Sequence, residues 1–434
     1  MKASNVTLIF SVALLLIITS NVNWYSVSWK DFLESDAKGY YAYLPATVVY
    51  QDLNFGFFDE IERVKYKNAS DIYDYRKEHD GFYINKYYCG TAFVLVPFYL
   101  VAHWLSILLG YDLDGYSYLY AIFQTIGAVF YCALGLFFLA RLLSFYRINE
   151  TNKSITLIAL LFGSNLFYYT VGELGMSHVY SFAFVAGFVF FIKRYFEKTA
   201  SRDIILASIF LGIIILIRPV NGLIIGLIPF LAGSYSSLKR GFLALKKHFL
   251  ALIISAIVCC AIVSIQLFIY KIQTGSFFIY SYDGEGFNFL NPQIFDFLFS
   301  YKKGLFVYTP MCFLALFGLI PLYKKSRFQF YSLVAFLIVV TYVLSSWWCW
   351  YYGGSFSTRV FVEYLPVFAL LLAISLQYIK EKVAKIAIRS FIVVLIVVCQ
   401  VQTFQYRYYE IHWAEMTKEM YWDVFLRVDK LMEK

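Results

Sequence analysis

Long apolar runs separated by short polar connectors make up most of the chain. Runs such as 6–22 and 252–270 consist largely of aliphatic and aromatic residues. Their lengths match the roughly 17 to 25 residues of a bilayer-spanning helix. The pattern predicts an all-α, polytopic integral membrane protein with about eleven transmembrane helices, expected at 6–22, 116–140, 155–171, 179–192, 204–217, 220–232, 249–270, 305–322, 329–346, 360–379 and 390–404.

One further apolar run, 91–109, has spanning length but contains Pro97 and His103. If it does not cross, 19 Lys and Arg residues of the N-terminus and the basic connectors face the cytoplasm, against five in the later outward connectors. If it crosses, 18 of those 19 face outward, against the positive-inside bias. We therefore expect 91–109 to be an interfacial or re-entrant helix. The short runs 204–217 and 220–232, which meet at Arg218, are either two spans or a re-entrant hairpin.

Composition narrows the class of protein further. The 434 residues are 61% hydrophobic and 15% charged, whereas soluble domains have roughly 45–50% and about 25%. The net charge of +9 is explained by basic connectors kept on the cytoplasmic side, so no nucleic-acid partner is expected. Seven Cys without a CxxC pair indicate neither a disulfide scaffold nor a zinc module.

The polar segments set the domain boundaries. Residues 1–404 form one transmembrane domain, which includes a charge-rich extracytoplasmic loop at 23–90, and residues 405–434 form an extracytoplasmic interfacial helix that covers the outer face. The first apolar run lacks a signal-peptide cleavage site, so we interpret it as an uncleaved anchor with a cytoplasmic N-terminus. The expected location is the inner (cytoplasmic) membrane, with membrane lipids as neighbours.

Two charged residues of the first outward loop are candidates for chemistry. Asp36 follows soon after the first span, where a partly desolvated carboxylate can act as a general base. Its other interpretation is a solvated loop acid or a helix N-cap. Lys86 stands just before run 91–109, where its ammonium pairs with a lipid phosphate or extends to the interface as an ordinary lysine.

Further candidates lie in the later outward turns. Glu173 and His178 occupy a short turn between two apolar runs, and His178 suits a phosphate, a metal or a helix cap. One His and one carboxylate fall far short of a metal-site pattern. Arg218 precedes Pro219 between apolar segments, where its guanidinium binds a phosphate or forms a structural ion pair.

The string WWCWYYGGSFSTRVFVEYLP at 347–366 contains two adjacent glycines and the hydroxyls of Ser355, Ser357 and Thr358. It also contains the guanidinium of Arg359, with Glu363 one helical turn later. This combination suits a phosphate group at the membrane surface. Its aromatic residues are equally typical of an interfacial belt.

The order of these features resembles the GT-C superfamily of polyprenyl-phosphate-dependent glycosyltransferases, most of all the protein O-mannosyltransferases and the transferase of aminoarabinose to lipid A (glycosyltransferase family 39 type). Asp36 is followed four residues later by Tyr40, as in the family's first outward loop, and Lys86 corresponds to the family's lysine. Glu173 or His178 stands where a second acid often follows the third span. The string GGSFSTR with its later Leu-Pro resembles bacterial members, and the likeness covers most of residues 6–232.

The resemblance implies a GT-C-like fold and a reaction outside the cytoplasm. A sugar would pass from a polyprenyl-phosphate donor to a hydroxyl of a glycan, lipid or protein acceptor, with inversion. Asp36 would deprotonate the acceptor, Tyr40, Glu173 and His178 would contribute to substrate binding, and Lys86, Arg218 and Arg359 would stabilise charge on the departing phosphate. No cofactor is implied for certain, and a divalent metal is left open.

Two other classes of function compete with this reading. A transporter or flippase of a lipid-linked or anionic solute commonly has inverted repeats and ionisable groups near the bilayer midplane, and neither is evident in the sequence. A non-catalytic membrane scaffold or an oligosaccharide polymerase of related architecture also fits the pattern.

Overall fold

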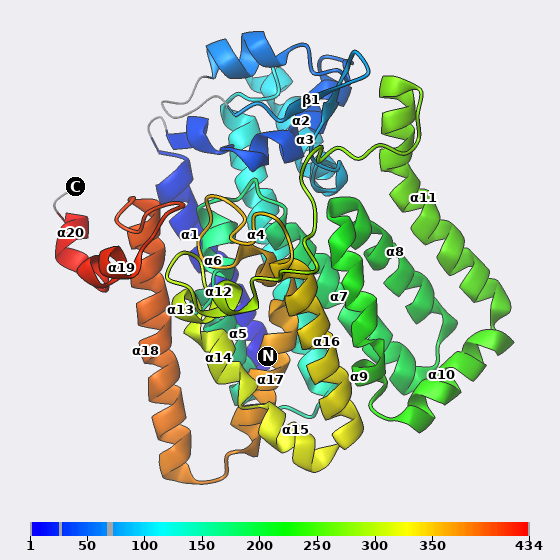
Figure 1. Ribbon diagram of the computed structural model, residues 1–434, viewed down its shortest axis with the longest axis vertical. Helices are drawn as coiled ribbons and strands as arrows, with labels where there is room; N and C mark the ends of the chain where they lie inside the picture. Colours follow the sequence, from blue (N-terminus) through cyan, green and yellow to red (C-terminus); the bar gives the residue numbers. More distant parts are fainter. Residues whose placement is uncertain (1, 26–27, 67–72, 433–434) are drawn as a thin grey trace.

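The protein is a bundle of helices with one short β-hairpin (Figure 1), and the computed structural model describes residues 2–25, 28–66 and 73–432. Within these ranges eight helices are long and apolar enough to cross a membrane, or nine if one bent helix pair counts as a span. The prediction of an all-α, multi-pass membrane protein is confirmed at this level. The eight are α1 (Ala3–Asn23), α3 (Gly90–Leu109), α4 (Tyr118–Phe145), α7 (His178–Lys198), α11 (Phe249–Thr274), α16 (Arg327–Ser345), η4 with α17 (Arg359–Tyr364 and Leu365–Tyr378) and α18 (Lys382–Arg407).

The predicted number of eleven spans is not confirmed, because four expected spans are short or interrupted and the run 91–109 qualifies by length. Between α13 and α14, Pro310 lacks the backbone N–H that would continue the helix beyond Tyr308. Between α14 and α15, the chain at Gly318 packs closely on Leu371, because a Cβ on Gly318 would lie 2.1 Å from the Leu371 carbonyl oxygen. The segments concerned are α5 (Glu150–Phe162) with α6 (Leu166–Val171), α8 (Ser201–Ile217), η3 (Pro219–Leu227) with α9 (Ile228–Ala232), and α13 (Leu305–Tyr308), α14 (Pro310–Leu316) and α15 (Leu319–Lys325).

The break between α8 and η3 places Arg218 at the end of a helix. The residue before a proline is driven out of the helical region, and Arg218 has the extended angles φ −151° and ψ 110°. The chain then runs through η3 and α9 and bends by 116° into α10 (Tyr235–Lys247).

The described part of segment 23–90 forms a compact layer at one end of the bundle, which we call the loop end (Figure 1). Its core is aromatic, with Phe55, Phe58 and Tyr75 fully buried. The strands pair antiparallel, with Arg76 opposite Asn85. Its elements are η1 (Ser28–Asp31), α2 (Asp36–Val48), η2 (Phe58–Lys65), β1 (Arg76–His79) and β2 (Phe82–Asn85).

Helix α3 runs antiparallel beside the first half of α4. Tyr131 donates to the Val94 carbonyl at 2.6 Å, and His103 lies 2.6 Å from the Tyr120 hydroxyl. Gly90 lies five residues after the end of β2, and Asp112, just beyond α3, pairs with Lys65 of η2 at 2.8 Å. Both ends of α3 therefore lie near the loop end.

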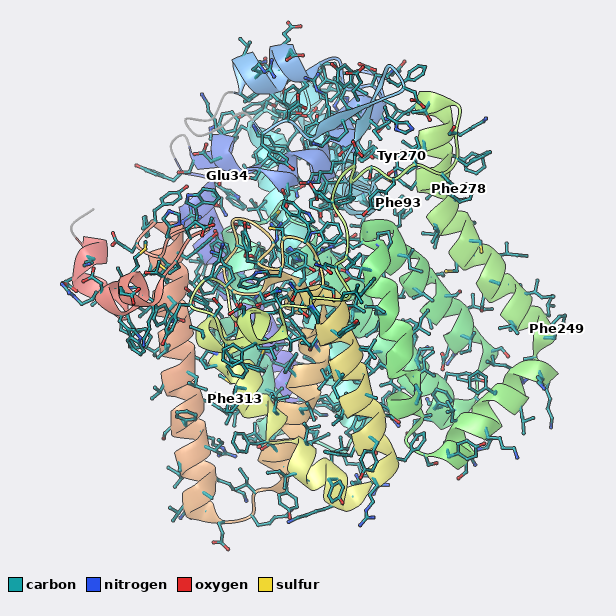
Figure 2. The ribbon with its side chains drawn as sticks, viewed as in Figure 1. Glu34, Phe93, Phe249, Tyr270, Phe278 and Phe313 are labelled. Atoms are coloured by element: carbon teal, nitrogen blue, oxygen red, sulfur yellow. The ribbon has the colours of Figure 1, made fainter. Side chains whose placement is uncertain are left out.

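The opposite end of the bundle carries α10, α15 and the turn between α17 and α18, and we call it the basic end (Figure 1). Between the two ends, apolar side chains project outward from the helices, as Phe249 and Phe313 do in Figure 2, where they are 62% and 48% exposed. An apolar exterior of this kind suits contact with lipid chains.

The C-terminal tail differs from the single interfacial helix that we expected. It contains two short helices, α19 (Lys418–Val424) and α20 (Val428–Met432), while α12 (Ile294–Phe299) lies in an earlier connector. Gln402 of α18 donates to the Tyr421 hydroxyl at 2.5 Å, and Lys302 pairs with Glu415 at 2.9 Å. The tail thus folds back onto the bundle.

Candidate functional site

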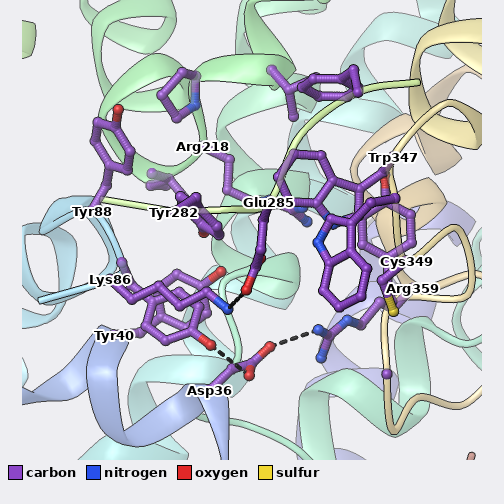
Figure 3. Close-up of a pocket in the computed structure, with 18 of the residues that line it drawn as sticks. Asp36, Tyr40, Lys86, Tyr88, Arg218, Tyr282, Glu285, Trp347, Cys349 and Arg359 are labelled. Carbon is purple, nitrogen blue, oxygen red and sulfur yellow. Dashed lines mark hydrogen bonds and ion pairs between the residues drawn. The ribbon is translucent and has the colours of Figure 1, made fainter. Parts of the chain in front are cut away.

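A cavity of about 400 Å³ opens between the loop end and the helical bundle (Figure 3). Its volume falls within the range of sites that bind small molecules. Three cations, two carboxylates and ten aromatic side chains are among the residues that line it: Asp36, Tyr40, Tyr73, Lys86, Tyr87, Tyr88, Ile217, Arg218, Pro219, Val220, Tyr280, Tyr282, Glu285, Phe287, Trp347, Trp348, Cys349, Tyr352, Gly353 and Arg359.

Asp36 is the first residue of α2 and lies at the base of this cavity. Its two carboxylate oxygens accept from Arg359, at 2.6 Å, and from the Tyr87 hydroxyl, also at 2.6 Å (Figure 3). Burial raises the pKa of Asp36, but the charge of Arg359, the two hydrogen bonds and the charge of Lys86 together bring it below its ordinary value. The carboxylate is therefore ionised at neutral pH and able to accept a proton.

Gly39 allows Tyr87 to approach Asp36. A Cβ on Gly39 would lie 2.3 Å from the Tyr87 ring, a distance that real Cβ atoms do not reach. The Tyr87 ring packs against Tyr40 with centroids 4.6 Å apart, and its hydroxyl also bonds to that of Tyr73. One turn of α2 thus carries the carboxylate and makes room for its aromatic donor.

Lys86 follows β2 and crosses the cavity to Glu285, with 2.5 Å between its Nζ and the carboxylate (Figure 3). Glu285 belongs to the connector after α11, which also supplies Tyr282, whose ring lies 5.3 Å from the ammonium. The cation predicted to bind a lipid phosphate is therefore held by an acid nearly 200 residues away in sequence.

Arg218 reaches the cavity from the α8 break and is backed by a buried carboxylate. Its guanidinium lies 3.2 Å from Glu363 Oε1, and His178 Nδ1 lies 3.0 Å from the same oxygen. Glu363 and His178 are 0% and 2% exposed, and no residue in the described part of the chain hydrogen-bonds to Glu363 Oε2. His178 therefore supports Glu363 behind Arg218, and it does not line the cavity.

Arg359 begins η4 after a loop with unusual backbone geometry. Tyr352, Gly353 and Ser357 all have left-handed φ angles, between 57° and 67°. Thr358 anchors the loop by donating to the Lys303 carbonyl at 2.8 Å. The hydroxyls of Ser355, Ser357 and Thr358 are buried and bonded within the protein, so our expectation that they face a phosphate is wrong.

Glu173 and Lys303 lie behind Arg359, outside the cavity lining. Burial raises the pKa of Glu173 to about 7, against the charge of Arg359 and a hydrogen bond from Tyr168 at 3.0 Å. Burial likewise lowers the pKa of Lys303 to about 7, and its ammonium sits 4.8 Å from the Tyr406 ring centre. Glu173 and Lys303 attract each other, and the charge of Arg359 attracts the Glu173 carboxylate and repels the Lys303 ammonium.

The cavity brings together five of the seven candidate residues, namely Asp36, Tyr40, Lys86, Arg218 and Arg359. The sequence analysis missed Tyr87, Glu285 and Lys303. Tyr87 stands next to Lys86 in the sequence, but tyrosine is so frequent here, with 39 copies, that one more carried no signal. No group of three or more His, Cys, Asp and Glu side chains suited to a metal ion occurs among the described residues.

The comparisons with known proteins add no assignment. No protein-family model matches the sequence, and no curated protein matches it significantly. The function therefore has to be inferred from the residues and the geometry.

Proposed function

We propose that the protein is a membrane glycosyltransferase that moves a sugar from a polyprenyl-phosphate carrier to an acceptor hydroxyl. The observation that carries the proposal is the contact between Asp36 and Arg359 in an aromatic-lined cavity that also contains Lys86 and Arg218. A base beside phosphate-binding cations is what a direct displacement at a sugar carbon requires.

The reaction has one bond-forming and one bond-breaking event at the same carbon. The acceptor oxygen attacks the anomeric carbon while the bond from that carbon to the phosphate oxygen breaks, and the configuration inverts. Asp36 takes the hydroxyl proton, and the bond's electron pair leaves with the polyprenyl phosphate. Arg359, Arg218 and Lys86 stabilise the negative charge that grows on that phosphate.

The charges and the aromatic surfaces of the cavity suit such a donor. Its lining holds three cations against two carboxylates, which favours an anion. Tyr40, Tyr282 and Trp347 offer apolar faces with polar edges, and side chains of this kind pack against one surface of a ligand while bonding to its hydroxyls.

We further propose a GT-C-like topology of about eleven crossings in the inner membrane. In this arrangement the loop end is extracytoplasmic, the basic end and the N-terminus are cytoplasmic, and α3 does not cross. The supports are the positive-inside count and the contacts that both ends of α3 make with the loop end.

Substitution of the base tests the proposal. Asp36→Asn keeps the shape of the side chain and removes its ability to accept a proton, so transfer of labelled sugar from a polyprenyl-phosphate donor to membrane acceptors is expected to fall about 100-fold or more. The matched control is Asp112→Asn, an exposed acid near the same end of the protein. Transfer by Asp36→Asn at the wild-type rate, with normal expression, would contradict the role of Asp36.

The second candidate function is a transporter or flippase of an anionic or lipid-linked solute. The fully buried Glu363 with His178 favours it, because ionisable groups within a membrane often mark solute pathways. Both residues lie in the first turns of their candidate spans, behind Arg218 rather than at mid-helix, which suits an enzyme better. Movement of a polyprenyl-phosphate sugar across liposomes that contain no acceptor would favour the transporter.

A further inference from the structure

Three neighbouring cavities occupy the basic end, far from the candidate active site. They measure about 450, 370 and 270 Å³. The first two share Tyr146, Lys325 and Gln329 in their walls, and the last two share Gln377 and Lys380. The shared residues show that the three cavities lie side by side, and we call them together the basic groove.

The basic groove has a strong excess of positive charge. Its walls contain one carboxylate, Glu197, which is already paired with Lys193 at 2.7 Å. Among the described residues, no acid lies within ion-pair distance of Arg147, Lys325 or Lys380. The cations of its walls are Arg147, Lys193, Lys324, Lys325, Lys380, Lys385 and Arg389.

The positive-inside bias explains why cations are frequent on this face, but it does not require them to surround a hollow. Lys193 is 7% exposed, donates to the Leu231 carbonyl at 3.3 Å and lies 5.2 Å from the centre of the Tyr146 ring. These contacts hold the Lys193 ammonium in a defined position in the wall of the groove, whereas the ammonium of a solvated lysine moves freely.

The middle cavity adds apolar walls to the charge. Ile148, Pro321, Leu322 and Ile374 line it beside Lys324 and Lys380. A free phosphate ion has no apolar atoms that could pack against such a surface. A phospholipid can place its phosphate among the cations and its glycerol and first acyl carbons against the apolar wall. Basic pockets between membrane helices are suited to acidic lipid headgroups.

We propose that the basic groove binds the headgroup of an anionic phospholipid. Arg147, Lys325 and Lys380, three of the six wall cations that form no ion pair with a described carboxylate, contact the lipid phosphate, and the lipid links α15, α17 and the start of α10 at this end of the bundle. In the topology proposed above, the lipid belongs to the cytoplasmic leaflet. The binding itself uses no residue of the candidate active site.

The test compares melting temperatures of the purified full chain in detergent with added phosphatidylglycerol or phosphatidylcholine. Phosphatidylglycerol is expected to raise the melting temperature and phosphatidylcholine is not. In the triple variant Arg147→Gln, Lys325→Gln, Lys380→Gln, the midpoint of the phosphatidylglycerol titration is expected to rise at least about tenfold, since each cation near a lipid surface contributes several-fold to affinity.

The control is the triple variant Lys239→Gln, Lys246→Gln, Lys247→Gln, which removes the same charge from exposed positions of α10 outside the groove. This control variant is expected to keep the wild-type midpoint of the phosphatidylglycerol titration. Asp36→Asn is also expected to keep it, so lipid binding can be tested independently of the proposed sugar transfer. Equal midpoints for the two triple variants would overturn the proposal, because they would indicate a general effect of surface charge. An equal stabilisation by inorganic phosphate would overturn it as well, because the site would then bind a free anion.

Discussion

The charged residues of the candidate site occur as pairs whose partners are far apart in sequence. Arg359 contacts Asp36, Lys86 contacts Glu285, and Arg218 contacts Glu363. Buried charges cost much less free energy when they are paired, so each pair keeps a cation near the cavity without an anionic ligand. The ligand then has to compete with carboxylates for these cations, which favours a strong anion such as a phosphate over weak ones.

A buried acid outside the candidate site predicts how stability depends on pH. Glu62 accepts from Tyr75 and Tyr116 at 2.7 Å each, and burial raises its pKa to about 7, although these hydrogen bonds lower it. Between pH 4.5 and 7 the folded chain binds more protons here than the unfolded chain. The free energy of unfolding therefore falls as pH rises through this window, by at most about 3 kcal/mol.

Glu62→Gln, which resembles the protonated acid, is expected to reduce this loss of stability. The measurement compares melting temperatures of the wild-type protein and the variant at about pH 5 and about pH 8. Part of the pH dependence should remain, because Glu173 has a similarly raised pKa. Glu60→Gln, at an exposed position of the same helix, is the control. A pH dependence unchanged by Glu62→Gln would show that this acid does not titrate as expected.

At the residue scale, the sequence located the chemical groups better than their partners. Asp36, Lys86, Arg218 and Arg359 were identifiable because charge is rare beside apolar runs. Their pairing depends on tertiary packing between segments up to about 320 residues apart, as for Asp36 and Arg359. No local pattern encodes such a contact.

At the scale of elements, one close helix contact supports the position of Arg218. Gly90, the first residue of α3, packs on the end of α8, and a Cβ there would lie 2.3 Å from the Ile217 backbone nitrogen. Backbone cannot yield as a flexible side chain does. Gly90→Ala is therefore expected to push α3 away from α8 and to destabilise the protein by about 1–3 kcal/mol.

A lower melting temperature of Gly90→Ala in detergent would confirm this expectation. Gly286→Ala serves as control, because nothing lies within 4 Å of a Cβ at that loop position. Equal melting temperatures for the two variants would mean that α3 and α8 separate without cost.

The interrupted helices show what hydrophobic periodicity does not reveal. Apolar runs predicted the positions of 155–171 and 305–322 as continuous spans, but the structure divides each of them into shorter helices. The breaks within 305–322 depend on Pro310 and on close packing at Gly318. A hydropathy pattern averages over both, so it locates a segment more reliably than it describes its continuity.

At the scale of the whole molecule, the proposed orientation predicts which positions are reachable from each side. Single Cys substitutions can be labelled with a membrane-impermeant maleimide in intact cells and again after lysis. Glu78→Cys in β1 and Asp112→Cys beyond α3 are expected to react in intact cells, whereas Lys239→Cys in α10 is expected to react only after lysis. The unsubstituted chain gives the background from its own seven cysteines.

Labelling of Glu78→Cys without Asp112→Cys in intact cells would contradict the placement of α3 on one side. Labelling of Lys239→Cys in intact cells would contradict the orientation as a whole. The basic connectors allowed the orientation to be inferred from sequence, because charge is counted without knowledge of the fold. The hollow at the basic end could not be inferred, because it depends on which connectors lie next to each other.

The two indoles in the lining of the candidate site have a practical consequence. Trp347 and Trp348 line the cavity, and indole fluorescence responds to the polarity and the quenchers around the ring. A phosphoisoprenoid that enters the cavity replaces water beside both rings, so the emission should shift to shorter wavelength as the site fills. The protein thus carries an optical reporter of occupancy that needs no attached dye.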